Sequence, residues 1–150
     1  MIIIALGCIM LTACGNKTDP ELENYRMSMD DFYSKLSYYD KSINAIDPES
    51  EGAGQELLTI LDQMNESYKA MAQIDVPEQF SGISELPSEA SEYMQMANEY
   101  YHMAYDGEFD EDNEYLASQY YERANSRVQV ILQVLHGEVP SGEGVSVDEE

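Results

Sequence analysis

The sequence predicts an all-α protein whose main domain, residues 19 to 136, is an up-down-up-down four-helix bundle. First, apolar residues recur at steps of three and four in four segments of similar length, the spacing of one helix face. Second, the links between the segments contain proline or glycine, which end helices, and short links favour antiparallel neighbours. Third, no stretch alternates polar and apolar residues with a period of two, as a half-buried strand would.

The first helix has a strong start signal at Asp19, Pro20 and Glu21. Asp suits the N-cap, proline suits the first helical position, and acidic side chains favour the positive end of the helix dipole. Its apolar stripe is Leu22, Tyr25, Met29, Phe32, Leu36, Tyr39, Ile43 and Ile46. The helix is expected to end at Asp47, because a residue before proline avoids the helical conformation.

The second helix is predicted to begin between Ser50 and Gly54 and to end by Asp75. Its stripe is Leu57, Leu61, Met64, Tyr68 and Met71. The connection from Pro77 to Pro87 is rich in turn residues, and its large apolar groups are Phe80, Ile83 and Leu86.

The third helix starts either near Ile83 with a bend or at Pro87. Its stripe is Ala90, Tyr93, Ala97, Tyr100 and Ala104. Alanines in this stripe would let a neighbouring helix approach closely.

The fourth helix is predicted from about Asp110–Asn113 to His136, closed by Gly137 and Pro140. Its stripe is Ala117, Tyr121, Ala124, Val128, Ile131 and Leu135. The end of this segment, 128–135, also suits a strand by propensity, but a lone strand would have no partner, so a helix is expected. Residues 137 to 150 show no periodicity and predict a disordered acidic tail.

The N-terminal stretch has the layout of a secretory signal peptide. Residues 2–11 are apolar and are followed by small residues. This run is too short for a membrane span, which needs about 20 apolar residues. The sequence Leu11-Thr12-Ala13-Cys14 resembles the lipobox of bacterial lipoproteins. One feature departs from an ordinary leader, which opens with Lys or Arg, because Met1 is followed directly by isoleucines. The resemblance implies that residues 1–13 are cleaved, that Cys14 carries a diacylglyceryl group, and that residues 14–18 form a tether.

The body of the chain, after the leader, also resembles a known group of proteins. The segment from Met71 to Phe80, Met-Ala-Gln-Ile-Asp-Val-Pro-Glu-Gln-Phe, is similar to small acidic helical lipoproteins of Gram-positive bacteria whose role is uncharacterised. The likeness covers much of residues 55 to 136. It implies a helical bundle and brings no active-site residues with it.

The charge of the chain restricts its partners. A formal net charge of −23, from 30 acidic and 7 basic residues, excludes a nucleic-acid binder, because phosphate binding depends on Lys and Arg. Anionic lipid headgroups would also repel the chain, so attachment to a membrane would depend on the acyl chains at Cys14. Since Cys8 would leave with the leader, no thiol remains for a disulfide, and the core must stabilise the domain.

Two patterns suggest metal sites but fit them poorly. Glu99 and His102 have the spacing of a di-iron bundle, yet the other histidine, His136, lacks a matching Glu, so a surface histidine is expected. The acidic loop from Asp106 to Glu114 lacks the glycine and the final Glu of an EF-hand, so a solvated loop is expected, with weak divalent-ion binding as the alternative. No cofactor is predicted. No nucleophile motif such as Gly-x-Ser-x-Gly is present, so an enzyme is not expected.

A partner surface is the remaining functional prediction. Val130 and Val134 fall outside the stripe of the fourth helix, so either the Pro77–Leu86 connection or a partner must cover them. The adjacent tyrosine pairs put rings on different helix faces, so Tyr101 and Tyr120 are further candidates for recognition, against the alternative that they fill the bundle.

The functional hypothesis is a lipid-anchored extracytoplasmic domain at the bacterial cell membrane that binds a protein or a cell-envelope component. The alternative is a lipoprotein that binds a small ligand or a metal ion. The sequence leaves the oligomeric state open.

Overall fold

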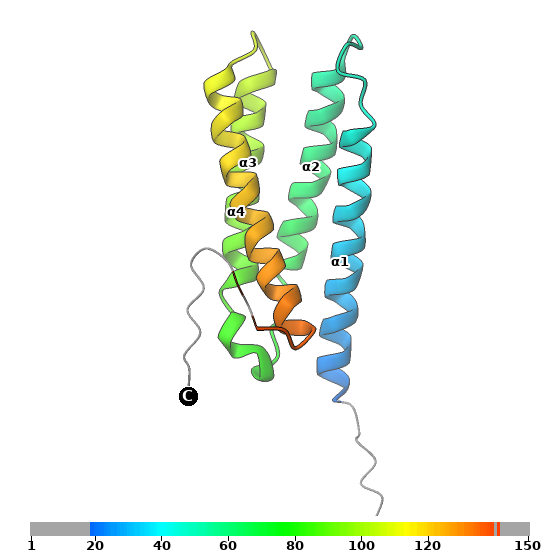
Figure 1. The fold of residues 1–150 in the computed structure, drawn as a ribbon, viewed down its shortest axis with the longest axis vertical. Coiled ribbons are helices and arrows are strands. Elements are labelled where there is room, and N and C mark those ends of the chain that lie inside the picture. The colour runs from blue at the N-terminus through cyan, green and yellow to red at the C-terminus, as the bar shows by residue number, and fades with distance from the viewer. Residues whose placement is uncertain (1–18, 140, 142–150) are drawn as a thin grey trace, which may run out of the picture.

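A computed structural model describes residues 19–139 and 141, and it contains four long helices. The elements are α1 (Pro20–Asn44), α2 (Ala53–Met71), a short 3₁₀ helix η1 (Glu78–Ile83), α3 (Leu86–Tyr105) and α4 (Glu111–Leu135). Consecutive helices run antiparallel, so the chain goes up, down, up and down (Figure 1). This confirms the all-α four-helix prediction. The leader, the lipobox and the tether lie outside the described residues, as does most of the predicted tail.

The helix starts at Asp19 and Asp110 follow the signals in the sequence, whereas α1 ends at Asn44, three residues before the predicted end at Asp47. The Asp19 carboxylate accepts a hydrogen bond from the backbone N–H of Glu21 at 3.0 Å, and Asp110 accepts one from Asn113 at 3.0 Å. Gly52, before α2, and Gly137, after α4, adopt positive φ angles of 105° and 73°, which favour glycine. The stretch 128–135 is helical, so the strand alternative is wrong.

The core lies along the centre of the bundle and is filled mainly by the predicted stripes. Tyr100 of the third stripe lies outside it, and Leu58 and Met94, which no stripe included, are buried. Its largest fully buried side chain, Tyr68, meets the edge of the Phe32 ring at a centroid distance of 5.1 Å. The Tyr68 hydroxyl donates a hydrogen bond to Asn125 Oδ1 on α4 at 2.8 Å. Such a partner is needed because an unpaired buried hydroxyl is unfavourable.

The α3–α4 pair is packed through alanines. Five of them are fully buried: Ala90, Ala97, Ala104, Ala117 and Ala124. Within each helix they are spaced by seven residues, so they form one continuous seam. The expectation that small residues allow close approach is confirmed.

The connection between α2 and α3 closes one end of the bundle. Ile83 of η1 is buried in the core, and Phe80 packs against Tyr25 with ring centroids 6.0 Å apart. The third helix begins at Leu86, after this 3₁₀ turn, which lies between the two predicted starting points.

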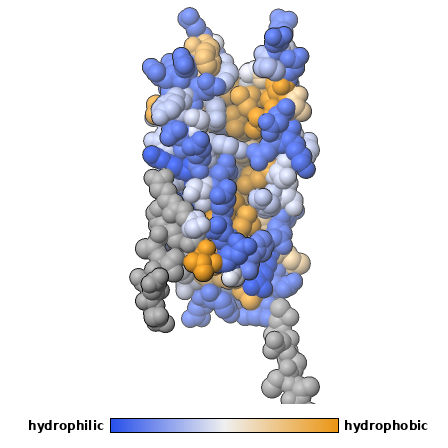
Figure 2. Space-filling view, viewed as in Figure 1, coloured by the Kyte–Doolittle hydropathy of each residue, from blue (hydrophilic) through white to orange (hydrophobic). Residues whose placement is uncertain are grey.

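The surface is dominated by hydrophilic side chains. Figure 2 shows them along the flanks of the molecule, with apolar side chains in the gap between the α3–α4 pair and the α1–α2 pair. Apolar groups therefore reach the surface mainly where the two pairs separate on this face.

Candidate functional site

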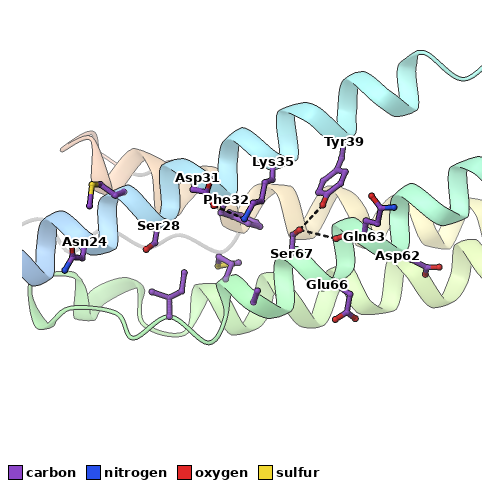
Figure 3. A pocket seen from close by; sticks show the side chains of 14 residues that line it. Asn24, Ser28, Asp31, Phe32, Lys35, Tyr39, Asp62, Gln63, Glu66 and Ser67 are labelled. Carbon is purple, nitrogen blue, oxygen red and sulfur yellow. Dashed lines mark hydrogen bonds and ion pairs between the residues drawn. The ribbon is translucent and has the colours of Figure 1, made fainter.

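A groove with a volume of about 870 Å³ lies between α1 and α2. Its deepest side chains are Phe32 and Met71, which belong to the core. Small residues at Ser28, Ser67 and Ala70 leave the space above them open. We call this concavity the α1–α2 groove (Figure 3).

The walls of the α1–α2 groove carry polar groups from both helices (Figure 3). The lining side chains include three carboxylates, on Asp31, Asp62 and Glu66, and one ammonium, on Lys35. Lys35 lies 2.7 Å from Asp31 on its own helix, so this ion pair does not bridge the groove. The α1–α2 groove is therefore apolar at its base and net acidic at its edges.

One hydrogen bond spans the α1–α2 groove and one exposed side chain extends it. The hydroxyls of Tyr39 and Ser67 lie 3.2 Å apart and join the two helices. Nearer the start of α1, Met27 is 55% exposed, which is high for an apolar side chain. Met is flexible and suits surfaces that adapt to a partner.

His102 lies beside the groove wall and links three segments. Its Nε2 is 2.9 Å from Asp62 Oδ1 on α2, and its Nδ1 is 2.8 Å from Asp106 Oδ2 after α3. Asn98 also donates to Asp62, at 2.9 Å. The hydrogen bond to Asp62 is the main cause that raises the pKa of His102, while burial opposes it. Burial raises the pKa of Asp62, but the bonds from Asn98 and His102 together outweigh it and lower that pKa.

This cluster is not built for a metal ion. The two carboxylates occupy opposite nitrogens of the His102 ring, so they cannot converge on one ion. Glu99, which has the di-iron spacing relative to His102, accepts a hydrogen bond from Gln95 at 3.0 Å instead. Among residues 19–139 and 141, no group of three or more His, Cys, Asp or Glu side chains is placed to hold a metal.

The acidic loop uses its carboxylates in local contacts. Asp106 contacts His102, Asp110 caps α4, and Glu114 accepts a 2.7 Å hydrogen bond from the Tyr105 hydroxyl. The loop therefore caps the fourth helix through Asp110 and contacts the end of α3 through Asp106 and Glu114.

The four residues proposed as a partner surface do not form one surface. Val130 is only 3% exposed, so its own chain covers it and it is not available to a partner in this fold. Val134 is partly buried and packs against the core. Tyr120 lies on the outer face of α3 and α4, stacked on Tyr100 at 5.6 Å and under the Arg123 guanidinium at 5.4 Å. Tyr101 instead lines a separate cavity with residues of all four helices.

Sequence reasoning missed the α1–α2 groove. The available signal was the set of small and polar residues next to the apolar stripes, such as Ser28 beside Met29 and Ser67 beside Tyr68. A stripe predicts what is buried, but it does not say how far apart two helices lie.

Comparisons with protein-family models, with curated proteins and with solved structures find no match to this chain. In the part of the chain that the structure describes, no helix combines the length and apolar content required to cross a membrane.

Proposed function

We propose that the protein is a lipid-anchored, extracytoplasmic helical domain of the bacterial cell envelope that binds a segment of a partner protein in the α1–α2 groove. The observation that carries the proposal is the groove itself, about 870 Å³ of open space with an apolar base between two helices. The anchor is the lipid on Cys14 that the lipobox implies. The role is one of binding rather than catalysis.

The chemistry of the groove defines the partner segment. Its lining runs from Asn24 to Tyr39 on α1, about 22 Å at 1.5 Å per residue, or four helical turns. An amphipathic helix of that length would place an apolar face over Phe32 and Met71, as in other helix-in-groove complexes. Lys or Arg residues along its edges would meet the net acidic rim. The net charge of −23 would also speed the approach of a basic partner.

The position of the groove fits a membrane anchor. α1 begins at Pro20, six residues after Cys14, and the first groove residue, Asn24, lies in its second turn. A short tether would therefore hold one end of the groove close to the membrane surface and leave its opening facing sideways. A partner anchored in the same membrane could reach it.

The anchor is tested by replacing Cys14. Metabolic labelling with a fatty acid should label the wild-type protein and should not label Cys14→Ala. Equal labelling of both proteins would reject the lipoprotein proposal.

The groove is tested with two synthetic helical peptides of equal length, one built from Leu and Lys and one from Leu and Glu. The Leu-Lys peptide should bind, and Ala70→Arg, which places a long charged side chain in the groove, should weaken it about tenfold or more. The control Ser34→Arg adds the same charge on an exposed face of α1 outside the lining. Equal weakening by both substitutions would show that charge alone attracts the peptide and would reject the groove as the site. Binding of the Leu-Glu peptide with the same affinity would reject the partner chemistry.

Small-ligand binding is the second candidate function. It is favoured by a different observation, the cavity that Tyr101 lines. Metal-ion binding finds no such support among the residues described.

A further inference from the structure

A second cavity opens at the end of the bundle where the α1–α2 and α3–α4 connections lie (Figure 1). Its volume is about 300 Å³, and all four helices contribute to it. We call it the tyrosine cavity. Its lining includes Asp40, Leu57, Leu61, Tyr101, Glu114 and Tyr121. In Figure 2, apolar side chains are visible at this end, in the gap between the two helix pairs.

Two carboxylates at the tyrosine cavity are held in place by tyrosine hydroxyls. Tyr121 donates a hydrogen bond to Asp40 Oδ1 at 2.8 Å, from α4 to α1. Tyr105 donates one to Glu114 Oε1 at 2.7 Å. Within the described residues, the second oxygen of each carboxylate takes part in no side-chain hydrogen bond.

These carboxylates have no cationic partner among the residues that the structure describes. Within residues 19–139 and 141, no ion pair with Lys, Arg or His involves Asp40 or Glu114. By contrast, Asp31, Asp62 and Glu66 of the α1–α2 groove each have such a partner. The tyrosine cavity therefore combines two oriented negative charges with an apolar lining.

The tyrosines of the cavity stay neutral over the physiological pH range. Burial is the main cause that raises the pKa of both Tyr101 and Tyr121, and nearby carboxylates raise it further, while a hydrogen bond with Asn125 opposes the shift at Tyr121. Their hydroxyls therefore remain hydrogen-bond donors, and their rings keep the electron-rich faces that attract cations.

We propose that the tyrosine cavity binds a small organic cation that carries its charge on an alkylammonium group. The ammonium would lie between Asp40 and Glu114, and its methylene or methyl groups would contact the rings of Tyr101 and Tyr121 and the side chains of Leu57 and Leu61. Recognition by aromatic rings together with carboxylates is typical for such cations. The volume, at the lower end of ligand pockets, restricts the ligand to a small molecule or a single side chain.

Other ligand classes fit less well. A hard metal ion such as Ca²⁺ requires six to eight oxygen ligands, whereas much of this lining is aliphatic and aromatic carbon. A neutral ligand would desolvate the two carboxylates without compensating their charge. An anion would be repelled. This inference does not depend on the α1–α2 groove or on the membrane anchor.

Calorimetric titration of the full chain with choline, with butylammonium and with the neutral choline isostere 3,3-dimethyl-1-butanol tests the proposal. At least one of the two cations should bind with one-to-one stoichiometry, and the neutral isostere should bind at least about tenfold more weakly. A third cation, Nα-acetyl-lysine methylamide, tests whether the alkylammonium group belongs to a lysine side chain or to a free amine. Tighter binding than butylammonium would indicate a lysine side chain of a polypeptide, and weaker binding would indicate a free amine.

Matched variants locate the site. Asp40→Asn and Glu114→Gln keep the shape of the side chain and an acceptor for the tyrosine, and each should weaken cation binding about tenfold. The controls Asp30→Asn and Glu111→Gln remove the same charge from exposed positions of the same two helices, outside both the tyrosine cavity and the α1–α2 groove, and should change affinity less than twofold. Tyr101→Phe should retain binding, whereas Tyr101→Leu, which removes the ring, should weaken it about three- to thirtyfold.

Three results would overturn the proposal. The first is the absence of binding by every cation to a wild-type protein whose circular dichroism shows it to be folded. The second is equal affinity for the neutral isostere. The third is an equal loss of affinity in the cavity variants and in their controls.

Discussion

The two helix pairs of the bundle differ in the size of the residues between them. α3 and α4 meet through five fully buried alanines, whereas α1 and α2 meet through large side chains such as Phe32, Leu36, Met64 and Tyr68. The distance between packed helices depends on the side chains at the contact, so small residues allow close packing and large ones separate the axes. The close pair has a filled seam and the wider pair has a groove.

The outer faces of the two pairs differ in the same way. On α3 and α4, Arg127 contacts Glu89 at 2.6 Å, and the Arg123 guanidinium lies over the rings of Tyr93 and Tyr120. Across α1 and α2, the 3.2 Å contact of Tyr39 with Ser67 leaves a long opening beside it. Side chains on the outer face of α3 and α4 therefore contact one another, while the side of α1 and α2 offers space for a ligand.

The largest effect is expected in the close pair, from Val130→Asp. Because Val130 is 3% exposed, the substitution would bury an unpaired charge and should lower the free energy of unfolding by about 3 kcal/mol or more. The neighbouring exposed residue, Gln129, provides the control. Gln129→Asp should change the free energy of unfolding by less than about 0.5 kcal/mol. Urea denaturation measures both. Equal stability of the two variants would mean that Val130 is accessible after all and would return it to the candidate partner surface.

Residue periodicity was sufficient to predict the fold. The stripe of α1, with its cap at Asp19, and the alanine repeat of α3 each specify a helix and the face that it buries. The sequence also showed that Val130 and Val134 needed a cover, but not which part of the molecule supplies it. A helical pattern is local, whereas burial of an off-stripe residue depends on how a loop returns to the surface.

The second test replaces one alanine by leucine in each helix pair. Ala97→Leu in the seam of α3 should destabilise the protein by about 2 kcal/mol, because a fully buried alanine leaves no space for three more carbon atoms. Ala70→Leu in the α1–α2 groove should change stability by less than about 0.5 kcal/mol, since that site is exposed. Thermal denaturation followed by circular dichroism compares them. Similar melting temperatures would contradict the difference in packing between the pairs.

The candidate sites could not be predicted from the sequence. Asp40 and Tyr121 are 81 positions apart, and their hydrogen bond depends on the antiparallel register of α1 and α4. Likewise, nothing local separates Tyr101, which lines a cavity, from its neighbour Tyr100, which stacks on Tyr120. Periodicity distinguishes buried positions from exposed ones, but cavities arise from the distances between helices.

A smaller effect is expected at the hydrogen bond that joins the two pairs through the core. Tyr68→Phe removes the donor to Asn125 while it keeps the ring, and it should destabilise the protein by about 1 kcal/mol. Tyr39→Phe removes the longer and more exposed contact with Ser67 and should have an effect below about 0.5 kcal/mol. Urea denaturation of both variants measures the difference. If Tyr39→Phe were the more destabilising, the bond across the groove would hold the helices more strongly than the core bond does.

The smallest effect is expected at His102, which joins the α1–α2 pair to the α3–α4 pair through Asp62. Because the folded-state pKa of His102 is raised, its protonated form stabilises the fold below about pH 6.5, the unfolded value, and this contribution is lost as pH rises through the folded-state pKa. The pKa of Asp62 is lowered, so the pair also weakens as pH falls below about 4. A partly exposed pair of this kind contributes less than about 1 kcal/mol.

The pH dependence of unfolding between pH 5 and 8 therefore provides the measurement. His102→Gln should reduce the loss of stability with rising pH, because glutamine keeps polar contacts but does not titrate. His136→Gln is the control, since His136 is exposed and forms no ion pair among the described residues. If both variants kept the wild-type pH profile, the contact between His102 and Asp62 would not link the two pairs energetically, and the core together with the Tyr68–Asn125 and Tyr121–Asp40 hydrogen bonds would join them.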